Sequence, residues 1–203
     1  MRRSSVVVVT LLCAMYFVAY VDRVNISMAA GVFGPELKLS NTEVGFAISA
    51  FGWTYLIFQI LGAWLGDQWG ARRTLTVCGI IVGVATISIG LAGGLGAIVA
   101  ARILLGLGEG ALFPVATRAL SQWVSLERRG WAQGATHAAA RLGNALTPPI
   151  IAVLITLSSW RGSFFVVGVF MIAWAAIWFG YFRDRDSNTQ AATAHAARNL
   201  PWS

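Results

Sequence analysis

The sequence predicts an all-α integral membrane protein with six transmembrane helices, and three observations support this fold class. Hydrophobic residues make up 57% of the chain and charged residues only 11%, whereas soluble domains usually carry about 25% charged residues. Long apolar segments follow one another along the chain, and each has about the 20 residues that a transmembrane helix needs. Most basic residues fall at the ends of these segments, where they act as topology signals.

Six segments are apolar and long enough to span a bilayer. They cover residues 6–29, 43–66, 75–95, 97–121, 131–156 and 163–182, with ends uncertain by a few residues. The first segment follows two arginines and could imitate a signal peptide. No small-residue cleavage site closes it and further spans follow, so we interpret it as the first transmembrane helix.

Short polar or glycine-containing breaks separate the six segments. They are residues 31–40, 67–73, 93–94, 127–129 and 158–161. The first break ends in a helix start signal, because Ser40 or Asn41 can cap the next helix and Glu43 can complete a capping box.

Basic residues predict the orientation of the bundle by the positive-inside rule. With the N-terminus inside, the inside segments hold nine arginines and the outside loops hold only Lys38 and Arg161. Both termini are therefore predicted to be cytoplasmic. The inside arginines are Arg2, Arg3, Arg72, Arg73, Arg128, Arg129, Arg183, Arg185 and Arg198.

The chain divides into two parts of different character. Residues 1–183 hold the six predicted helices, whereas residues 184–203 are polar, alanine-rich and without an apolar span. We interpret the second part as a cytoplasmic tail or linker.

Several function classes are disfavoured by composition. The net charge of +7 does not indicate nucleic-acid binding, because the basic residues form no face or stripe. Cys13 and Cys78 lie in apolar runs, so no disulfide framework is expected. No metal-ligand cluster, nucleophile elbow or phosphate loop is present, so an enzyme is not expected.

Four charged residues lie inside predicted spans. Asp22 and Arg23 are in the first span, and Arg102 and Glu109 are in the fourth. A charge at the centre of a bilayer costs about 2.5–3.5 kcal/mol on insertion scales, so such residues are interpreted by default as an ion or substrate path.

The geometry of a helix constrains these four residues further. Arg102 and Glu109 are two turns apart on one face, so the acid can exchange a proton while the arginine holds an anion or the ionised acid. The alternative is that they only close an interhelical salt bridge, which stabilises poorly compared with apolar replacements. Asp22 and Arg23 point about 100° apart, so each needs a partner on another helix or in a wet cavity. The alternative for them is snorkelling at the outer interface.

Other polar residues inside spans are weaker candidates. Tyr55 and Gln59 are four residues apart, so they share a face and can hydrogen-bond a polar ligand, although Tyr55 could equally pack against lipid or protein. His137 and Arg141 have the same spacing. We favour Arg141 as a functional residue and interpret His137 as a packed, hydrogen-bonded ring. Arg118 is expected to snorkel.

The turn at residues 63–73, which reads A-W-L-G-D-Q-W-G-A-R-R, resembles the signature of the major facilitator superfamily, G-x-x-x-D-[RK]-x-G-[RK]-[RK]. It keeps Asp67, Gly70, Arg72 and Arg73, but differs at Ala63 and at two further positions. In the family this turn latches the two halves of the transporter, so the resemblance gives Asp67 and Arg72 that role. The departures imply a weaker latch.

Three further stretches resemble the anion:cation symporters of that superfamily. Residues 20–27 read Y-V-D-R-V-N-I-S and resemble the first-helix motif Y-x-D-R-x-N-x-S. Residues 102–114 resemble the fourth-helix motif, and residues 137–149 resemble the fifth helix. The resemblance runs from about residue 10 to residue 184. It implies one half of a major facilitator fold, built as a 3+3 inverted repeat.

The resemblance implies import of an organic anion, such as a hexonate, hexuronate or aldarate, together with protons across the bacterial inner membrane. Asp22 and Glu109 would carry protons, and Arg23 and Arg102 would neutralise the substrate or the ionised acids. The cavity would be lined by Tyr55, Gln59, Tyr20 and Arg141. No cofactor beyond the coupling protons is implied.

A complete transporter of this kind has two six-helix halves with the substrate between them. The sequence resembles one half, so three interpretations remain: a fragment of a longer transporter, which we favour, a partner of a separate second half, or a homodimer. A drug:proton antiporter is a less favoured alternative, because residues 143–149 do not fit the fifth-helix pattern of those proteins and because the buried arginines favour an anion. A membrane sensor that signals through residues 184–203 is the other alternative.

Overall fold

The computed structural model describes residues 3–184 as five long helices. They are α1 (Arg3–Glu36), α2 (Asn41–Gly90), α3 (Leu95–Trp123), α4 (Leu126–Leu157) and α5 (Trp160–Tyr181). Each is long and apolar enough to cross a membrane. The all-helical architecture suits a lipid bilayer, which offers no water to backbone N–H and C=O groups, because a helix satisfies its backbone hydrogen bonds within its own segment.

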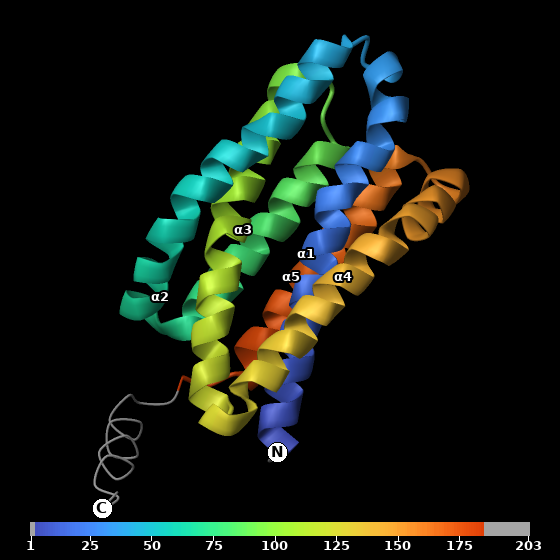
Figure 1. The fold of residues 1–203 in the computed structure, drawn as a ribbon. Helices are drawn as coiled ribbons and strands as arrows, with labels where there is room; N and C mark the ends of the chain where they lie inside the picture. The colour runs from blue at the N-terminus through green and yellow to red at the C-terminus, as the bar shows by residue number, and fades with distance from the viewer. Residues whose placement is uncertain (1–2, 185–203) are drawn as a thin grey trace, which may run out of the picture.

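The second helix contains two of the predicted spans. An unbroken helix of 50 residues would be about 75 Å long, more than twice the thickness of the hydrocarbon core. At Gly70 the backbone leaves the helical region, with φ 78° and ψ 163°. Figure 1 shows that the chain reverses there, so that residues 41–69 (the first arm) and 71–90 (the second arm) run side by side in opposite directions. The described residues therefore form five helices, and the prediction of six spans counted the arms of α2 separately.

The ends of the helices lie within a few residues of the predicted breaks, with one longer extension. Residues 127–129, which the sequence placed in a break, lie in the first turn of α4, which begins at Leu126. Ser40 caps α2, and its hydroxyl and Glu43 form the expected capping box. By contrast, α1 continues through residues 31–36, which the sequence placed in a break. Phe33 explains the extension, because its ring is fully buried and packs 5.5 Å from the ring of Trp160.

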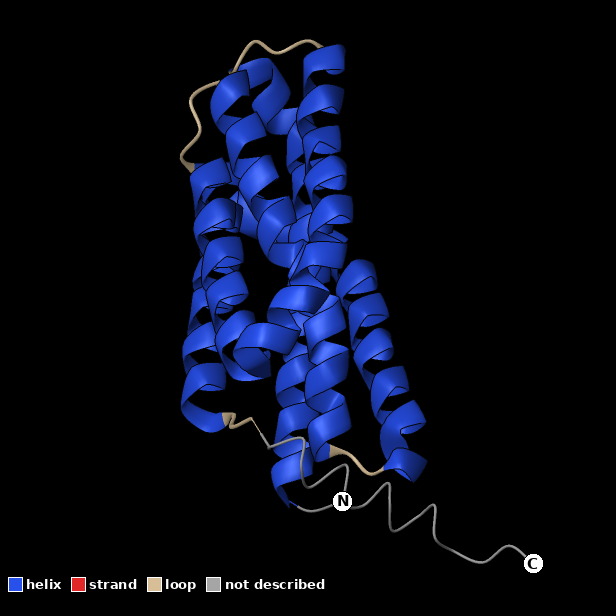
Figure 2. Ribbon diagram, turned by 90° about the vertical axis from the view of Figure 1, so that its left-hand side faces the viewer, coloured by secondary structure: helices blue, strands red, loops and turns tan. Residues whose placement is uncertain are grey.

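Glycines allow the helices of the bundle to approach closely. A Cβ at Gly106 would lie 2.6 Å from the carbonyl oxygen of Phe51, and one at Gly110 would lie 2.8 Å from that of Tyr55. These glycines of α3 therefore allow close contact with the backbone of the first arm of α2. Figure 2 shows the helices as one elongated bundle joined by short loops at its two ends.

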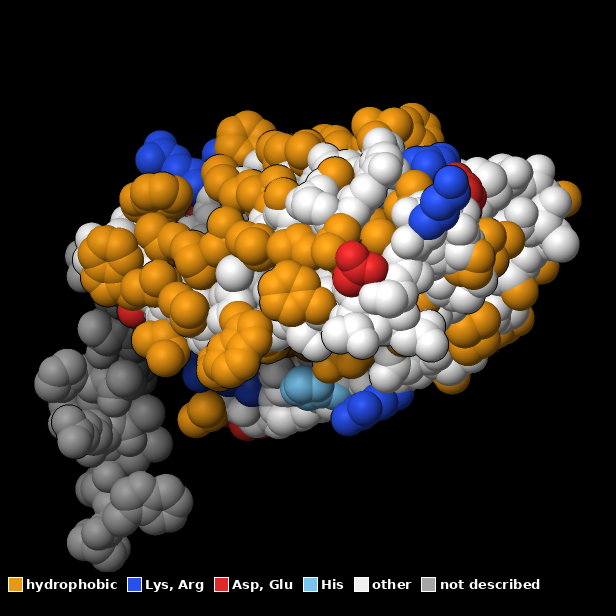
Figure 3. Space-filling view, turned by 90° about the horizontal axis from the view of Figure 1, so that it is seen from above, with side chains coloured by type: hydrophobic (Ala, Val, Ile, Leu, Met, Phe, Trp, Pro, Cys, Tyr) orange, Lys and Arg blue, Asp and Glu red, His pale blue; other side chains and the backbone are white. Residues whose placement is uncertain are grey.

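Large apolar side chains are exposed on every helix. Figure 3 shows them covering much of the visible face. Exposed apolar area of this extent marks a surface that meets lipid or another protein. The most exposed of them include Trp53, Ile60, Leu91, Leu126, Leu157 and Phe170.

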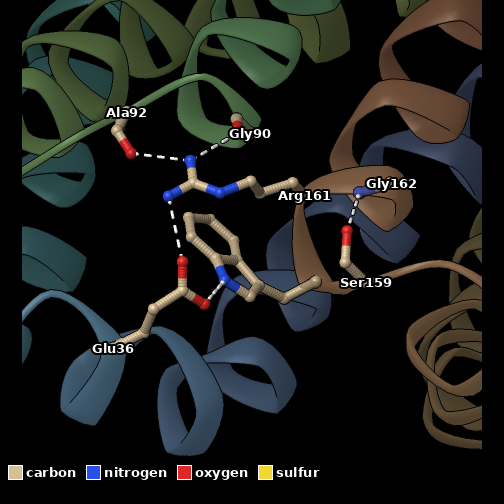
Figure 4. A network of polar contacts seen from close by, with 7 residues as sticks. Glu36, Gly90, Ala92, Ser159, Arg161 and Gly162 are labelled. Carbon is tan, nitrogen blue, oxygen red and sulfur yellow. Dashed lines mark hydrogen bonds and ion pairs between the residues drawn. The ribbon is translucent and has the colours of Figure 1, made fainter.

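A polar network ties three helix ends together at the end of the bundle opposite the N-terminus, called here the far end (Figure 4). One guanidinium nitrogen of Arg161 donates to the carbonyl oxygens of Gly90 at 3.0 Å and Ala92 at 2.8 Å, and another donates to Glu36 at 3.1 Å. The indole N–H of Trp160 donates to the same carboxylate at 2.6 Å. Arg161 therefore closes the last turn of α2 and joins it to α1 and α5.

Candidate functional site

The four intramembrane charges come together in the middle of the bundle. Asp22 is 1% exposed, Arg102 3% and Glu109 0%. The side chain of Arg23 is 23% exposed. Charged groups that are this buried need partners, because leaving water costs several kcal/mol per ion. The contacts of each residue therefore indicate what the site can do.

Arg23 and Glu109 form an ion pair between α1 and α3. The guanidinium Nε of Arg23 donates to a carboxylate oxygen of Glu109 at 2.6 Å. The second oxygen of Glu109 is buried and has no hydrogen-bond partner within the described part of the chain. The structure thus pairs Glu109 with Arg23 of α1 and not with Arg102, which lies two helical turns away along α3.

Aromatic rings surround the guanidinium of Arg23. Its central carbon lies 4.5 Å from the ring centroid of Tyr55, 5.1 Å from those of Tyr20 and Phe113, and 5.2 Å from that of Phe51. A cation over aromatic faces is held electrostatically even where water is scarce. Tyr20 and Tyr55, which the sequence singled out as cavity residues, belong to this aromatic group.

Arg102 uses only part of its hydrogen-bonding capacity within the described residues. Its Nη2 donates to the carbonyl oxygen of Ile48 at 3.0 Å, and its guanidinium lies 4.6 Å from the ring centroid of Phe51. Its Nε and Nη1, together with Nη2 of Arg23, are buried and have no hydrogen-bond partner among residues 3–184. Buried donors are usually paired, and arginine N–H groups match carboxylate-type anions in geometry and charge.

Asp22 is held by a hydroxyl group instead of a cation. Thr86, on the second arm of α2, contacts Oδ2 of Asp22 at 2.7 Å. The other oxygen, Oδ1, is buried and has no hydrogen-bond partner among the residues that the structure describes. Adjacent on α1, Asp22 and Arg23 reach different helices, as the sequence predicted. Thr86 was missed, because one threonine in an apolar span gives no signal by itself.

The remaining predicted residues lie apart from these contacts or at their edge. Gln59 is exposed on the first arm of α2, and Arg141 is exposed on α4. His137 packs edge-on against Tyr16, with 5.7 Å between ring centroids, and lies 3.3 Å from the amide of Gln133. His137 is nevertheless exposed on α4, so these contacts support a hydrogen-bonded ring but not a buried one.

The predicted latch lies at the N-terminal end of the bundle. Asp67 forms an ion pair with Arg118 of α3, a residue that was expected to snorkel. Arg72 donates to the carbonyl oxygen of Phe179 at 2.9 and 2.8 Å and covers its ring. Arg73 lines a surface hollow of about 310 Å³ together with residues of both arms of α2 and of α5.

Asp184 closes this turn from the other side. Its carboxylate accepts hydrogen bonds from the backbone N–H of Ala71 at 2.8 Å and from that of Arg72 at 3.2 Å. A Cβ at Gly70 would lie 2.7 Å from the same carboxylate. An acid at this position complements the unsatisfied N–H groups and the positive end of the second arm.

Residues 12–203 match the family model described as Major Facilitator Superfamily. The chain belongs to this superfamily. It is 41% identical over 191 residues to the probable sulfoacetate transporter SauU of Cupriavidus necator, an alignment that covers 94% of this chain and 44% of that protein. It is 31% identical over 183 residues to the hexuronate transporter of Bacillus subtilis, covering 90% of this chain and 43% of that protein. It is also 32% identical over 162 residues to the D-galactonate transporter of Escherichia coli, covering 80% of this chain and 38% of that protein.

Solved structures of the superfamily share the fold. A bacterial homologue of the human lysosomal transporter Spinster, inward-facing and occupied, superposes with a TM-score of 0.86 at 19% identity, over 92% of this chain and 46% of that one. The proton:xylose symporter XylE superposes with a TM-score of 0.72 at 16% identity, over 87% of this chain and 44% of that one. The superfamily consists of transporters, not enzymes, and its members cross the membrane several times. The chain corresponds to the N-terminal half of such a transporter and spans less than half the length of these curated relatives.

Proposed function

We propose that this chain supplies the N-terminal half of a proton-coupled importer of an organic anion, with a carboxylated sugar acid such as a hexonate, hexuronate or aldarate as substrate. The observation that carries the proposal is the set of three buried guanidinium nitrogens without partners, two on Arg102 and one on Arg23, beside the buried acids Asp22 and Glu109. The names of the relatives, which include transporters of hexuronate, D-galactonate and sulfoacetate, support an anionic substrate.

Each charged residue has a separate role in this proposal. Arg102 binds the anion, because its free N–H groups can donate to a carboxylate. Arg23 binds either the anion or Glu109, so the substrate competes with Glu109 for the same guanidinium. A buried carboxylate that loses its cation is stabilised by taking a proton. Anion binding therefore promotes protonation of Glu109, and Asp22 is the second proton carrier.

The aromatic group around Arg23 supports this competition. A guanidinium held over four rings keeps a favourable environment while its carboxylate partner is exchanged. Tyr20 and Tyr55 add hydroxyl groups that can bind a polyhydroxylated substrate. Gln59 and Arg141 are exposed on helices that would face the second half, so we assign them to the cavity wall as well.

The architecture that we propose is six spans in a 3+3 inverted repeat over residues 1–183. A linker follows from residue 184; beyond Asp184, it lies outside the described residues. A second six-helix half, in a longer chain or a separate one, completes the substrate site. We place the protein in the inner membrane with both termini in the cytoplasm, on the basis of the arginine distribution. Asp67, Gly70, Arg72 and Arg73 form the conformational latch between the halves.

Uptake measurements in proteoliposomes test the proposal. The chain is reconstituted together with its second half, and accumulation of radiolabelled galactonate, glucuronate, glucarate and sulfoacetate is measured with and without an inward proton gradient. We expect at least one sugar acid to accumulate only with the gradient. Absence of uptake of any organic anion would defeat the assignment.

Two variants separate the proposed roles. Arg102→Gln removes the free donors and should abolish binding and uptake. Glu109→Gln mimics the protonated acid, so it should abolish gradient-driven accumulation while substrate exchange across the membrane continues. Arg128→Gln, at an exposed arginine in the first turn of α4, is the matched control and should transport normally. Glu109→Gln that still accumulates substrate in response to the gradient would contradict the coupling role.

A further inference from the structure

The hydroxyl group of Thr86 has one hydrogen but lies within hydrogen-bonding distance of two other oxygen atoms. Its Oγ1 lies 2.7 Å from Oδ2 of Asp22 and 2.8 Å from the carbonyl oxygen of Val82, one helical turn earlier. A hydroxyl group donates one hydrogen bond but can accept others. When Asp22 is ionised, the single hydrogen of Thr86 is divided between the carboxylate and the carbonyl oxygen of Val82. When Asp22 is protonated and donates to Thr86, both contacts become full hydrogen bonds.

Both protonation states of Asp22 fit the same positions of the heavy atoms. When Oδ2 carries a proton, it donates to Thr86, and the threonine hydroxyl donates to Val82. When the proton leaves to solvent in the transport cavity, the threonine hydroxyl rotates and donates to Oδ2. The carbonyl group of Val82 tolerates the loss, because it also accepts a hydrogen bond within the helix.

The charged residues around Asp22 make its hydrogen bond with Thr86 important. Glu109 and Arg102 approach from α3, and Arg23 lies beside it on α1. Within residues 3–184 Asp22 forms no ion pair, and its side chain is hydrogen-bonded to the hydroxyl of Thr86. From α5, Ser163 donates a hydrogen bond to Asn25, which lies three residues after Asp22 on α1, at 2.9 Å. Thr86 is thus the residue that can stabilise the ionised form of Asp22 by direct donation.

We propose that Thr86 is a positioning residue for proton transfer at Asp22, holding that carboxyl group in one place in both of its protonation states. The transport role of Asp22 rests on the proposed function, but the hydrogen-bond exchange at Thr86 does not. The competing explanation is ordinary: threonines in apolar helices often bond the carbonyl group four residues earlier. Thr147 provides a matched example, because it is fully buried and bonds the carbonyl of Gly143 at 2.6 Å.

Infrared titration of the purified chain in lipid nanodiscs tests the proposal without requiring transport. Asp22→Asn identifies the carboxyl band of Asp22, and the pH midpoint of that band is then followed in other variants. Thr86→Val keeps the shape of the side chain and removes its hydroxyl group. We expect its midpoint to move to higher pH by about one to two units, the effect of losing one hydrogen bond to an ionised group. Thr86→Ser should keep the original midpoint.

Thr147→Val is the control, and it should leave the midpoint unchanged because it loses only a bond to the backbone. If Thr86→Val does not fold, Thr86→Cys replaces it, and its weak donor should move the midpoint in the same direction by less. An unchanged midpoint in the Val or Cys variant, or an equal shift in Thr147→Val, would overturn the proposal. In the reconstituted transporter the pH profile of uptake should shift with the midpoint. Failure of all anion uptake with an intact infrared shift would contradict the proposed function alone.

Discussion

Replacing Arg23 by methionine removes the cation from a carboxylate that has no access to solvent. Glu109 is 0% exposed, and its carboxylate accepts a hydrogen bond from Arg23 at 2.6 Å. Methionine fits among the four aromatic rings without introducing another polar group. The variant therefore isolates the consequence of a buried carboxylate without its partner.

The expected loss of stability depends on pH. Breaking a buried ion pair by removing one partner costs about 3–5 kcal/mol while the remaining group stays charged. In Arg23→Met the folded state relieves that cost by binding a proton at Glu109, whereas the unfolded state leaves Glu109 ionised near neutral pH. The folded state then binds one more proton than the unfolded state. Stability relative to the parent chain must therefore fall as pH rises, by about 1.4 kcal/mol per pH unit over that range.

Unfolding of the chain in detergent micelles, followed by circular dichroism over a series of pH values, measures this slope. Glu109→Gln is the matched variant, and it should show no such slope because glutamine binds no proton. In the double variant Arg23→Met/Glu109→Gln, the two losses should not add, with a coupling energy of about 0.5–3 kcal/mol. A slope in Arg23→Met no steeper than that of the parent, or additive losses in the double variant, would refute the ion pair as an energetic unit.

Two further predictions concern the ends of the bundle. Gly70→Ala should destabilise the chain by at least about 1–2 kcal/mol, because a Cβ is strained at positive φ and would collide with Asp184. Gly130→Ala, on α4 with open space around it, should stabilise the chain by up to about 1 kcal/mol. Thermal unfolding of the two variants measures the difference. Arg161→Ala should lower the free energy of unfolding by about 1–2 kcal/mol and speed amide hydrogen exchange at the far end. Arg161→Lys should not restore protection from exchange, because an ammonium group cannot reach two carbonyl oxygens and Glu36 together. Unchanged exchange in Arg161→Ala would contradict the role of that network.

The fold could be predicted from the sequence because hydrophobicity and length decide it. Spans, breaks and the capping box at Ser40 depend on local patterns, and the structure confirms them within a few residues. The continuation of α1 to residue 36 depends on the contact of Phe33 with Trp160, which are far apart in the chain. No local pattern contains such a contact. Two predicted spans fall within α2 because the chain reverses at the single residue Gly70, and the residues on both sides of it are helical.

The candidate site could be predicted only as a set of residues. The sequence identified charges that a membrane rejects, and helix geometry showed that Asp22 and Arg23 need different partners. Which partner each finds depends on how the helices pack, so the sequence did not join Arg23 to Glu109 or Asp67 to Arg118. Thr86 lay outside sequence reasoning altogether, since its importance arises from its distance to Asp22.

The different partners of the two buried acids have a consequence for coupling. Under the proposed function, Glu109 is bound to a cation that an anionic substrate would also bind, so its proton affinity would depend on whether substrate is present. Under the proposed function, Asp22 is bound to the hydroxyl of Thr86 and not to a cation that the substrate would bind, so it would respond to substrate only through the charge of Glu109. When substrate draws Arg23 away and Glu109 becomes protonated, Asp22 loses a repelling neighbour and can ionise more easily. Substrate binding would then move a proton from one acid to the other with no direct contact between the substrate and Asp22.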